Sequence, residues 1–344
     1  MESTAVAVTG MIDEDERRAP SPLERVQRTL HKYPALGPLI VLILLIATFS
    51  LIAPERFLKP FNLSLIISQV TVVGTLAIGQ TIIILTAGVD LSVGAIAVFA
   101  SIVMANVNVA WGVPGVLALI LGFAFGTGCG LLNGWLITRF RMPPFIVTLG
   151  TLSIFFALDL YVSGSATVRG TDMDPILVLP GQVIEFLGTR FTLGSIGMLV
   201  AYGIMMYLLR FTAWGRHIFA VGDEPESARL SGVRTDRLLL SVYGAAGLLY
   251  ALGAWFLLGR INAASPQALE SANLETITAV VIGGTSLFGG RGGVLGTLFG
   301  AIIVGTAVNG LTIAGFDPLW QRFAIGVLVI VAVGMDQWIR RVGK

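Results

Sequence analysis

Residues 210–237, RFTAWGRHIFAVGDEPESARLSGVRTDR, separate two long hydrophobic halves of a 344-residue chain. Nine of these residues are charged, and we take this stretch as the longest interior segment too polar to lie in a lipid core. A connection between two spanning helices needs only a few residues, so this loop is longer than that task requires. The simplest interpretation is a solvated loop, which is the usual role of a charge run. The alternative is a docking element for a cytosolic partner.

The centre of this loop, residues 223–230, predicts one short amphipathic helix. We expect Asp223 to cap its start, and Pro225 lies in the first turn, where proline is tolerated. Gly232 is expected to end the helix, because glycine adopts the left-handed conformation found just after many helices.

Composition places the rest of the chain in a membrane. The sequence is 55% hydrophobic and 12% charged, whereas about 25% of an ordinary soluble domain is charged. Its 42 glycines suit helices that pack backbone to backbone in lipid. A net charge of +2 is too small to indicate nucleic-acid binding. Cys129 is the single cysteine, and His31 and His217 lie in separate polar segments. We therefore expect neither a metal site nor a bound cofactor.

The apolar runs predict an all-α polytopic membrane protein, because a spanning helix needs about 20 apolar residues. About ten such runs follow one another: 36–53, 63–86, 91–110, 113–138, 145–162, 193–209, 238–258, 274–287, 294–313 and 319–339. The run at 274–287 is short and leads into GGRGG at 289–293, which indicates a span that stops early or breaks. We therefore expect a cytosolic, partly disordered polar tail at 1–35 and a transmembrane domain at 36–340, with the polar loop at 211–236.

The basic residues indicate the orientation of this domain. With ten spans and a cytosolic N-terminus, 16 of the 22 Lys and Arg residues fall on the cytosolic side, as the positive-inside rule requires. All six tryptophans lie near predicted span ends, where an indole prefers the membrane interface. We expect a multi-pass protein of the inner (plasma) membrane, in contact with its lipids, with both termini in the cytosol.

Two similar passages indicate a weak inverted repeat. LNG at 132–134 and VNG at 308–310 each end a glycine-rich span, and each leads through proline and an aromatic residue to another span. The expected topology gives the two passages opposite directions, which in transporters places the path between the halves. The alternative is that Asn-Gly and Pro are ordinary turn residues.

Polar residues inside or beside the spans are candidates for the passage or for helix breaks. They are Gln80, Asp90, Ser92, Asn133 and Asn309. An ionisable residue at membrane depth is costly and usually faces a cavity, a partner or a helix end. Asp90 has a second interpretation at least as strong as a role in transport, namely the N-cap of a helix beginning at Leu91. The same caution applies to Asp159.

Several motifs stand out in the apolar half-chains and the charged loop: IGQT at 78–81, LTAGVDLSVG at 85–94, NG at 133–134, PFIVTLGT at 144–151, ARLSG at 228–232 and AVVIGGTSLFGG at 279–290. Together they resemble the ribose-type permease subunits of bacterial ABC sugar importers, binding-protein-dependent systems of the inner membrane. The resemblance covers roughly residues 36–340, and its motifs follow one another in the same order as in the family. It implies a permease without chemistry of its own, forming the passage for a monosaccharide such as ribose, xylose or a related small carbohydrate.

The resemblance also implies partners. These are cytosolic ABC ATPase subunits, an external sugar-binding protein and a second permease subunit in a homodimer or paired heterodimer. The family's coupling segment, which docks on the ATPase, corresponds to Gly222, Asp223, Glu226, Ala228, Arg229, Leu230 and Gly232. We expect Ala228 and Leu230 to pack into the ATPase, with Glu226 and Arg229 pairing at the rim. Many members have Asn at the position of Asp223 and Ala-Ala at 227–228, where this chain has Ser-Ala.

The alternative function for this chain is that of an ion-coupled secondary transporter of a small polar solute, with Asp90 or Asp159 as the ion site. Such a carrier has no need of a docking helix in the charged loop, so that loop favours the importer. An intramembrane enzyme is less consistent with the sequence, because no His-Glu-x-x-His motif and no Ser/His constellation is present. The chain also lacks a phosphate-loop lysine, so ATP hydrolysis is expected in a separate subunit.

Overall fold

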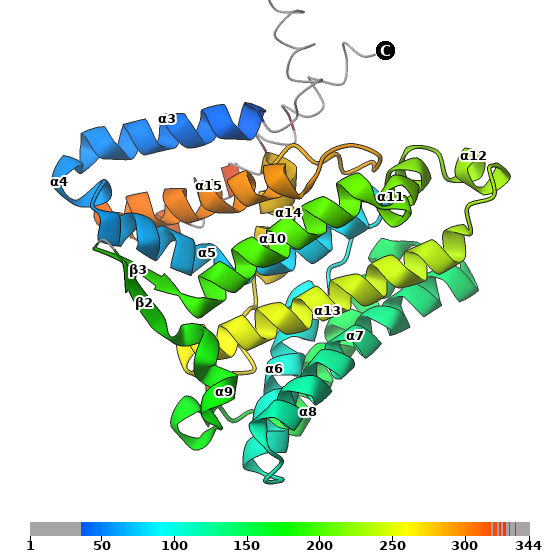
Figure 1. The fold of residues 1–344 in the computed structure, drawn as a ribbon, viewed down its shortest axis with the longest axis horizontal. Helices are drawn as coiled ribbons and strands as arrows, with labels where there is room; N and C mark the ends of the chain where they lie inside the picture. The colour runs from blue at the N-terminus through cyan, green and yellow to red at the C-terminus, as the bar shows by residue number, and fades with distance from the viewer. Residues whose placement is uncertain are drawn as a thin grey trace, which may run out of the picture.

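Nine apolar helices form the frame of the computed structural model, which describes residues 36–317 except Leu187, with scattered positions between 319 and 334 (Figure 1). Six of them are long and apolar enough to cross a membrane: α5 (Pro60–Leu85), α7 (Gly115–Phe140), α8 (Pro144–Ser163), α10 (Leu193–Phe211), α13 (Thr235–Ile261) and α15 (Val294–Ile313). Three are shorter: α3 (Leu36–Ile52), α6 (Val93–Val109) and α14 (Ala272–Ile282). This pattern confirms a helical, polytopic membrane protein.

Each of the nine helices corresponds to one of the ten predicted spans, with ends that differ by a few residues. The tenth span, 319–339, and the polar tail, 1–35, lie largely or wholly outside the described residues, so the total of ten stays a prediction. The early stop expected in the run 274–287 is confirmed, because α14 ends at Ile282. Non-helical chain follows as far as Gly293, and Gly284, Gly289, Gly290 and Gly292 have positive φ there.

Helix α13 lies at the centre of the bundle, between α5 and α7. It runs antiparallel to α7, since Gly126 packs against Gly247 and Ala251 while Gly134 packs against Leu240. Glycines allow these backbones to touch, as the composition predicted. Helix α13 is likewise antiparallel to α5, because the Arg260 guanidinium donates to the Gln69 carbonyl (2.8 Å) and Tyr250 packs on Gly79.

The two helices that carry the Asn-Gly passages run in opposite directions. Helix α15 is antiparallel to α5, because Thr297 meets Thr81 (2.8 Å between hydroxyls) and Asn309 meets Asn62 (3.1 Å). Since α5 and α7 are both antiparallel to α13, α7 and α15 have opposite senses. That relation is the one expected of an inverted repeat, and the equivalence of the two halves stays a prediction.

Large apolar side chains remain exposed on the outer helices. On α8, Ile154 and Tyr161 are 54% and 85% exposed, and α3 and α10 carry similar residues. Among the described helices these faces form an apolar surface too extensive for water. Lipid, or a second subunit, would cover it.

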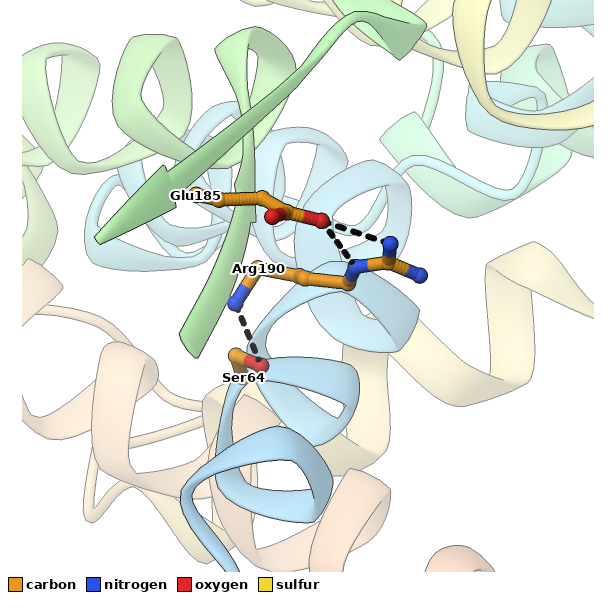
Figure 2. Close-up of polar contacts among 3 residues, drawn as sticks. All are labelled: Ser64, Glu185 and Arg190. Carbon is orange, nitrogen blue, oxygen red and sulfur yellow. Dashed lines mark hydrogen bonds and ion pairs between the residues drawn. The ribbon is translucent and has the colours of Figure 1, made fainter. Parts of the chain in front are cut away.

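One end of the bundle carries short non-spanning elements, most of them between the predicted spans 145–162 and 193–209, with α4 and β4 elsewhere in the chain. They are α4 (Pro54–Phe57), β1 (Val168–Arg169), η1 (Gly170–Asp172), α9 (Pro175–Val178), η2 (Leu179–Gly181), β2 (Val183–Phe186), β3 (Thr189–Thr192) and β4 (Ala263–Ala264). Figure 2 shows the ion pair of the β2–β3 hairpin, in which Arg190 donates to Glu185 at 2.6 and 2.8 Å. The Arg190 backbone nitrogen donates to the Ser64 hydroxyl (3.0 Å), which ties the hairpin to the start of α5.

The opposite end carries α11 (Ala213–Asp223) and α12 (Pro225–Leu230), between α10 and α13 (Figure 1). These two helices are the charged segment from which the sequence argument began.

Candidate functional site: the α11–α12 segment and the polar cluster

The charged segment forms two helices, whereas the sequence predicted one. Thr212 caps α11 by accepting a hydrogen bond from the Gly215 N–H (3.2 Å), and Ile218 and Val221 bury the inner face of α11. The expected cap by Asp223 is wrong. Asp223 is the last residue of α11, and Glu224, with no side-chain cap bond, precedes α12.

The end of α12 agrees with the prediction made for Gly232. This glycine has φ +89°, and its N–H donates to the Arg229 carbonyl (3.0 Å). The next N–H, of Val233, donates to the Ala228 carbonyl (3.1 Å). These two bonds form a Schellman motif, which satisfies carbonyls that the helix end would leave unpaired.

The surface of α12 divides its residues into two groups. Ala228 is only 5% exposed and packs within this chain, whereas Leu230 is 79% exposed. Glu226 and Arg229 form an exposed ion pair of 2.7 Å. The apolar contact that α12 offers to another molecule is therefore Leu230, and Ala228 already serves this chain's own packing.

Gly222 allows α11 to touch two other segments directly. A Cβ atom at this position would overlap the Leu85 carbonyl oxygen at the end of α5 and would crowd the Gly290 nitrogen. The same Gly290 N–H donates to the Leu85 carbonyl at 3.0 Å. The end of α11, the end of α5 and the loop after α14 therefore meet through backbone atoms.

Beyond Leu85, the connection to α6 carries a buried hydrogen-bonded chain. One oxygen of Asp90, Oδ1, accepts from the Ser92 N–H (2.8 Å) and from the Ser92 hydroxyl (2.6 Å). The side-chain amide of Asn133 on α7 donates to that hydroxyl (2.9 Å). Helix α6 begins at Val93, so the predicted N-cap role of Asp90 at a helix starting with Leu91 is wrong. Asp90 instead orders the turn before the helix.

Gln80 and two tyrosines of α13 complete this group. The Tyr250 hydroxyl donates to Gln80 Oε1 (3.4 Å), and the Tyr243 hydroxyl lies against Gly88. We call these six residues the polar cluster: Gln80, Asp90, Ser92, Asn133, Tyr243 and Tyr250. All are buried.

Some atoms of the polar cluster have no hydrogen-bond partner among the described residues. They are Gln80 Nε2, Asp90 Oδ2, Asn133 Oδ1 and the Tyr243 hydroxyl. Buried polar atoms are normally paired, so unpaired ones need a reason such as bound water or a second conformation.

Four of the five polar candidates thus come together, and the fifth does not. Asn309 lies between α15 and α5, where it donates to Asn62. Asp159, on α8, is also apart and lines a cavity considered below. Sequence reasoning missed Tyr243 and Tyr250, because a tyrosine in an apolar span looks like any core residue. It also missed α11, although Thr212 followed by apolar residues at 214, 218 and 221 was a usable signal.

Comparison with known proteins gives matches over most of the chain. A family model described as "Branched-chain amino acid transport system / permease component" matches residues 62–333. A fructose import permease of Rhizobium meliloti is 46% identical over 323 residues, which is 93% of this chain and 90% of that protein. No solved structure matches.

Two further relatives match over similar shares of their length. A ribose import permease of Bacillus subtilis is 40% identical, over 88% of this chain and 92% of that protein. A D-allose transport system permease of Escherichia coli is 33% identical, over 89% and 92%. All three curated relatives are named for the movement of a monosaccharide, whereas the family model is named for amino acids.

Proposed function

The chain belongs to the family of branched-chain amino acid transport system permease components, and from this premise we propose that it is the membrane permease of an ATP-driven ABC importer for a monosaccharide. The observation that carries the proposal is the match to sugar import permeases along about nine-tenths of both chains. Fructose and ribose are the first sugars to test, because the two relatives with 46% and 40% identity are named for them.

The energy source in this proposal is a separate ATPase that docks on α11 and α12. The support is the position of α12 at one end of the bundle, its exposed Leu230 and the ion pair between Glu226 and Arg229. An exposed pair contributes only about 0–1 kcal/mol. The affinity for the ATPase therefore rests on the apolar contact of Leu230 and on the shape fixed by Gly232.

The same proposal orients the molecule. The α11–α12 end faces the cytosol together with both termini, and the β2–β3 end faces outward, toward the sugar-binding protein. The distribution of Lys and Arg along the chain supports this choice. A second permease subunit, identical or related, would cover part of the exposed apolar surface and complete the passage.

One observation favours a second candidate, an ion-coupled carrier. Asp159 is buried in the spanning helix α8 with both carboxylate oxygens unpaired among the described residues. Such a carboxylate is the kind of group that proton- or sodium-driven carriers use.

Reconstitution in vesicles separates the two candidates. With the ATPase and the binding protein present, we expect concentrative uptake of D-fructose or D-ribose that requires ATP. With the chain alone, we expect none under a sodium or proton gradient. Concentrative, gradient-driven uptake without the ATPase would reject the importer and establish the carrier.

A further inference from the structure

A cavity of about 310 Å³ lies between α6, α8 and the chain that leads from α13 to α14. Its polar lining consists of Ser153, Asp159, Glu270 and Asn273, and Phe156 contributes an aromatic ring. Helices α6 and α8 run parallel at this place, because Thr148 donates to the Val89 carbonyl (3.1 Å) and Asn106 to the Val162 carbonyl (3.0 Å). The cavity therefore lies alongside the middle of α8, and neither the α11–α12 segment nor the polar cluster lines it.

Asp159 is the unusual member of this lining. Its side chain is 1% exposed, and neither oxygen has a hydrogen-bond partner in the part of the chain that the structure describes. A carboxyl group without partners is costly to bury, and more so in a membrane-spanning helix. The residue is retained at a cost to stability, which points to a ligand that supplies the missing hydrogen bonds.

The backbone on the other side of the cavity is not helical. Residues 265–271 connect β4 to α14 without regular structure, and the Leu269 carbonyl lies so close to Gly94 of α6 that a Cβ there would be 2.8 Å away. Irregular backbone beside spanning helices is tolerated where it is buried in protein or lines a water-filled cavity. In transporters, interruptions of this kind mark solute sites.

The chemistry of the lining fits a polyhydroxylated ring. The Asp159 and Glu270 carboxylates can accept hydrogen bonds from sugar hydroxyls, and the Asn273 amide can both donate and accept them. The Phe156 ring offers an apolar face to C–H groups. The volume is at the lower end of the range of about 300–1,000 Å³ for small-molecule sites. A metal ion fits less well, because the described residues contain no group of three or more His, Cys, Asp or Glu that could hold one.

We infer that this cavity is a transient binding site for the transported monosaccharide, with Asp159 accepting hydrogen bonds from its hydroxyl groups. The inference rests on the proposed function and adds a location and a ligand residue to it. The site holds the sugar between its delivery by the binding protein and its release on the cytosolic side.

Cysteine protection tests the site directly in the complete importer, reconstituted in vesicles. Cys129 is the chain's single cysteine, so Cys129→Ala provides a background for Ser153→Cys in the cavity. Tyr161→Cys, on the exposed end of α8, is the matched control. D-fructose or D-ribose at about ten times its dissociation constant leaves about a tenth of the sites free and should slow maleimide labelling of Ser153→Cys roughly tenfold. Labelling of Tyr161→Cys should not change.

Variants of Asp159 test the residue. Asp159→Leu should abolish the protection without lowering the melting temperature, because it removes an unpaired buried carboxylate and retains the volume. Asp159→Asn keeps one acceptor and should need roughly tenfold more sugar for the same protection. Thr151→Val is the matched control, a buried polar-to-apolar change on α8 outside the cavity. In this variant the sugar should slow labelling of Ser153→Cys as much as in the parent.

Three results would overturn the inference. The first is protection that survives Asp159→Leu. The second is labelling of Ser153→Cys that sodium chloride slows, relative to choline chloride, while neither sugar does. The third is ATP-driven sugar uptake without protection of Ser153→Cys. ATP-driven uptake by the unmodified importer is measured in parallel. Uptake without protection rejects this site alone, whereas absence of ATP-driven uptake of both sugars rejects the proposed function.

Discussion

At the scale of single residues, Asp90 owes its position to two hydrogen bonds from Ser92, and Ser92 in turn is fixed by Asn133. The sequence marked all three as unusual in apolar surroundings but could not show that they meet, because Asn133 lies 41 positions after Ser92. It also left open whether the charge of Asp90 matters. The geometry indicates that its acceptor oxygen is what the turn uses.

Asp90→Asn should therefore retain transport, because Asn offers an oxygen at the Oδ1 position. Asp90→Ala should lose it, because the Ser92 N–H and hydroxyl would be left without an acceptor at about 1–3 kcal/mol. Sugar uptake and the melting temperature in detergent measure the two effects. If Asp90→Asn abolished uptake while assembly stayed intact, the charge itself would have a role in transport.

Gly222 gives a second prediction at this scale. Gly222→Ala places a Cβ against the Leu85 carbonyl and should destabilise the protein by about 1–3 kcal/mol. Gly203→Ala, in α10, is the matched control, since a Cβ there meets nothing within 4 Å. An alanine in that open position should be neutral or stabilise α10 by about 0.5–1 kcal/mol. Thermal unfolding in detergent should separate the two variants, and equal melting temperatures would contradict the contact.

At the scale of elements, the spans followed from hydropathy, since each needs a continuous apolar run. The α11–α12 segment did not follow so simply. Its charges suggested one exposed helix, but Ile218, Val221 and Ala228 bury an inner face that only the tertiary structure reveals. The end of α12 was predictable, because the left-handed turn at Gly232 is a local property of the backbone.

The elements predict how docking variants behave. Leu230→Glu should reduce ATPase pull-down and uptake, because it places a charge in the proposed apolar contact. Gly232→Val should act similarly, since a branched side chain opposes φ +89° by about 1–2 kcal/mol or more. Glu226→Gln should reduce ATPase pull-down and uptake only slightly, because it removes an exposed ion pair. Ala228→Trp is a poor probe, because Ala228 is buried within the chain and its replacement disturbs this fold first. Undiminished binding by both Leu230→Glu and Gly232→Val would mean that α12 is only a connection.

At the scale of the whole molecule, the helical fold class and the nine apolar helices could be predicted from sequence, whereas the arrangement of the helices could not. Apolar runs in lipid carry little information about which helices touch. The contacts depend on small residues such as Gly126 and Gly247, which occur in many helices of this glycine-rich chain. The orientation stays a prediction, which rests on the distribution of Lys and Arg along the chain.

That orientation can be measured in intact cells with cysteines in the Cys129→Ala background. Val183→Cys, on the exposed β2 strand, should react with a membrane-impermeant maleimide added from outside. Ser227→Cys, on the exposed face of α12, should react only after the membrane is permeabilised. Both substitutions leave the Glu185–Arg190 and Glu226–Arg229 pairs intact. The reverse pattern of labelling would invert the topology.

The meeting of Gly222, Leu85 and Gly290 has a mechanical consequence. Side chains that lie between two segments can absorb a shift of one segment, because their rotamers change before the backbone of the other segment moves. Here the contact is made by the Leu85 carbonyl, the Gly290 N–H and the Gly222 Cα, so no side-chain rotamer at these three atoms can absorb a displacement. A displacement of the end of α11 would therefore act directly on the end of α5, five residues before Asp90. This backbone contact links the proposed docking segment to the turn that is held by the buried hydrogen bonds of Asp90.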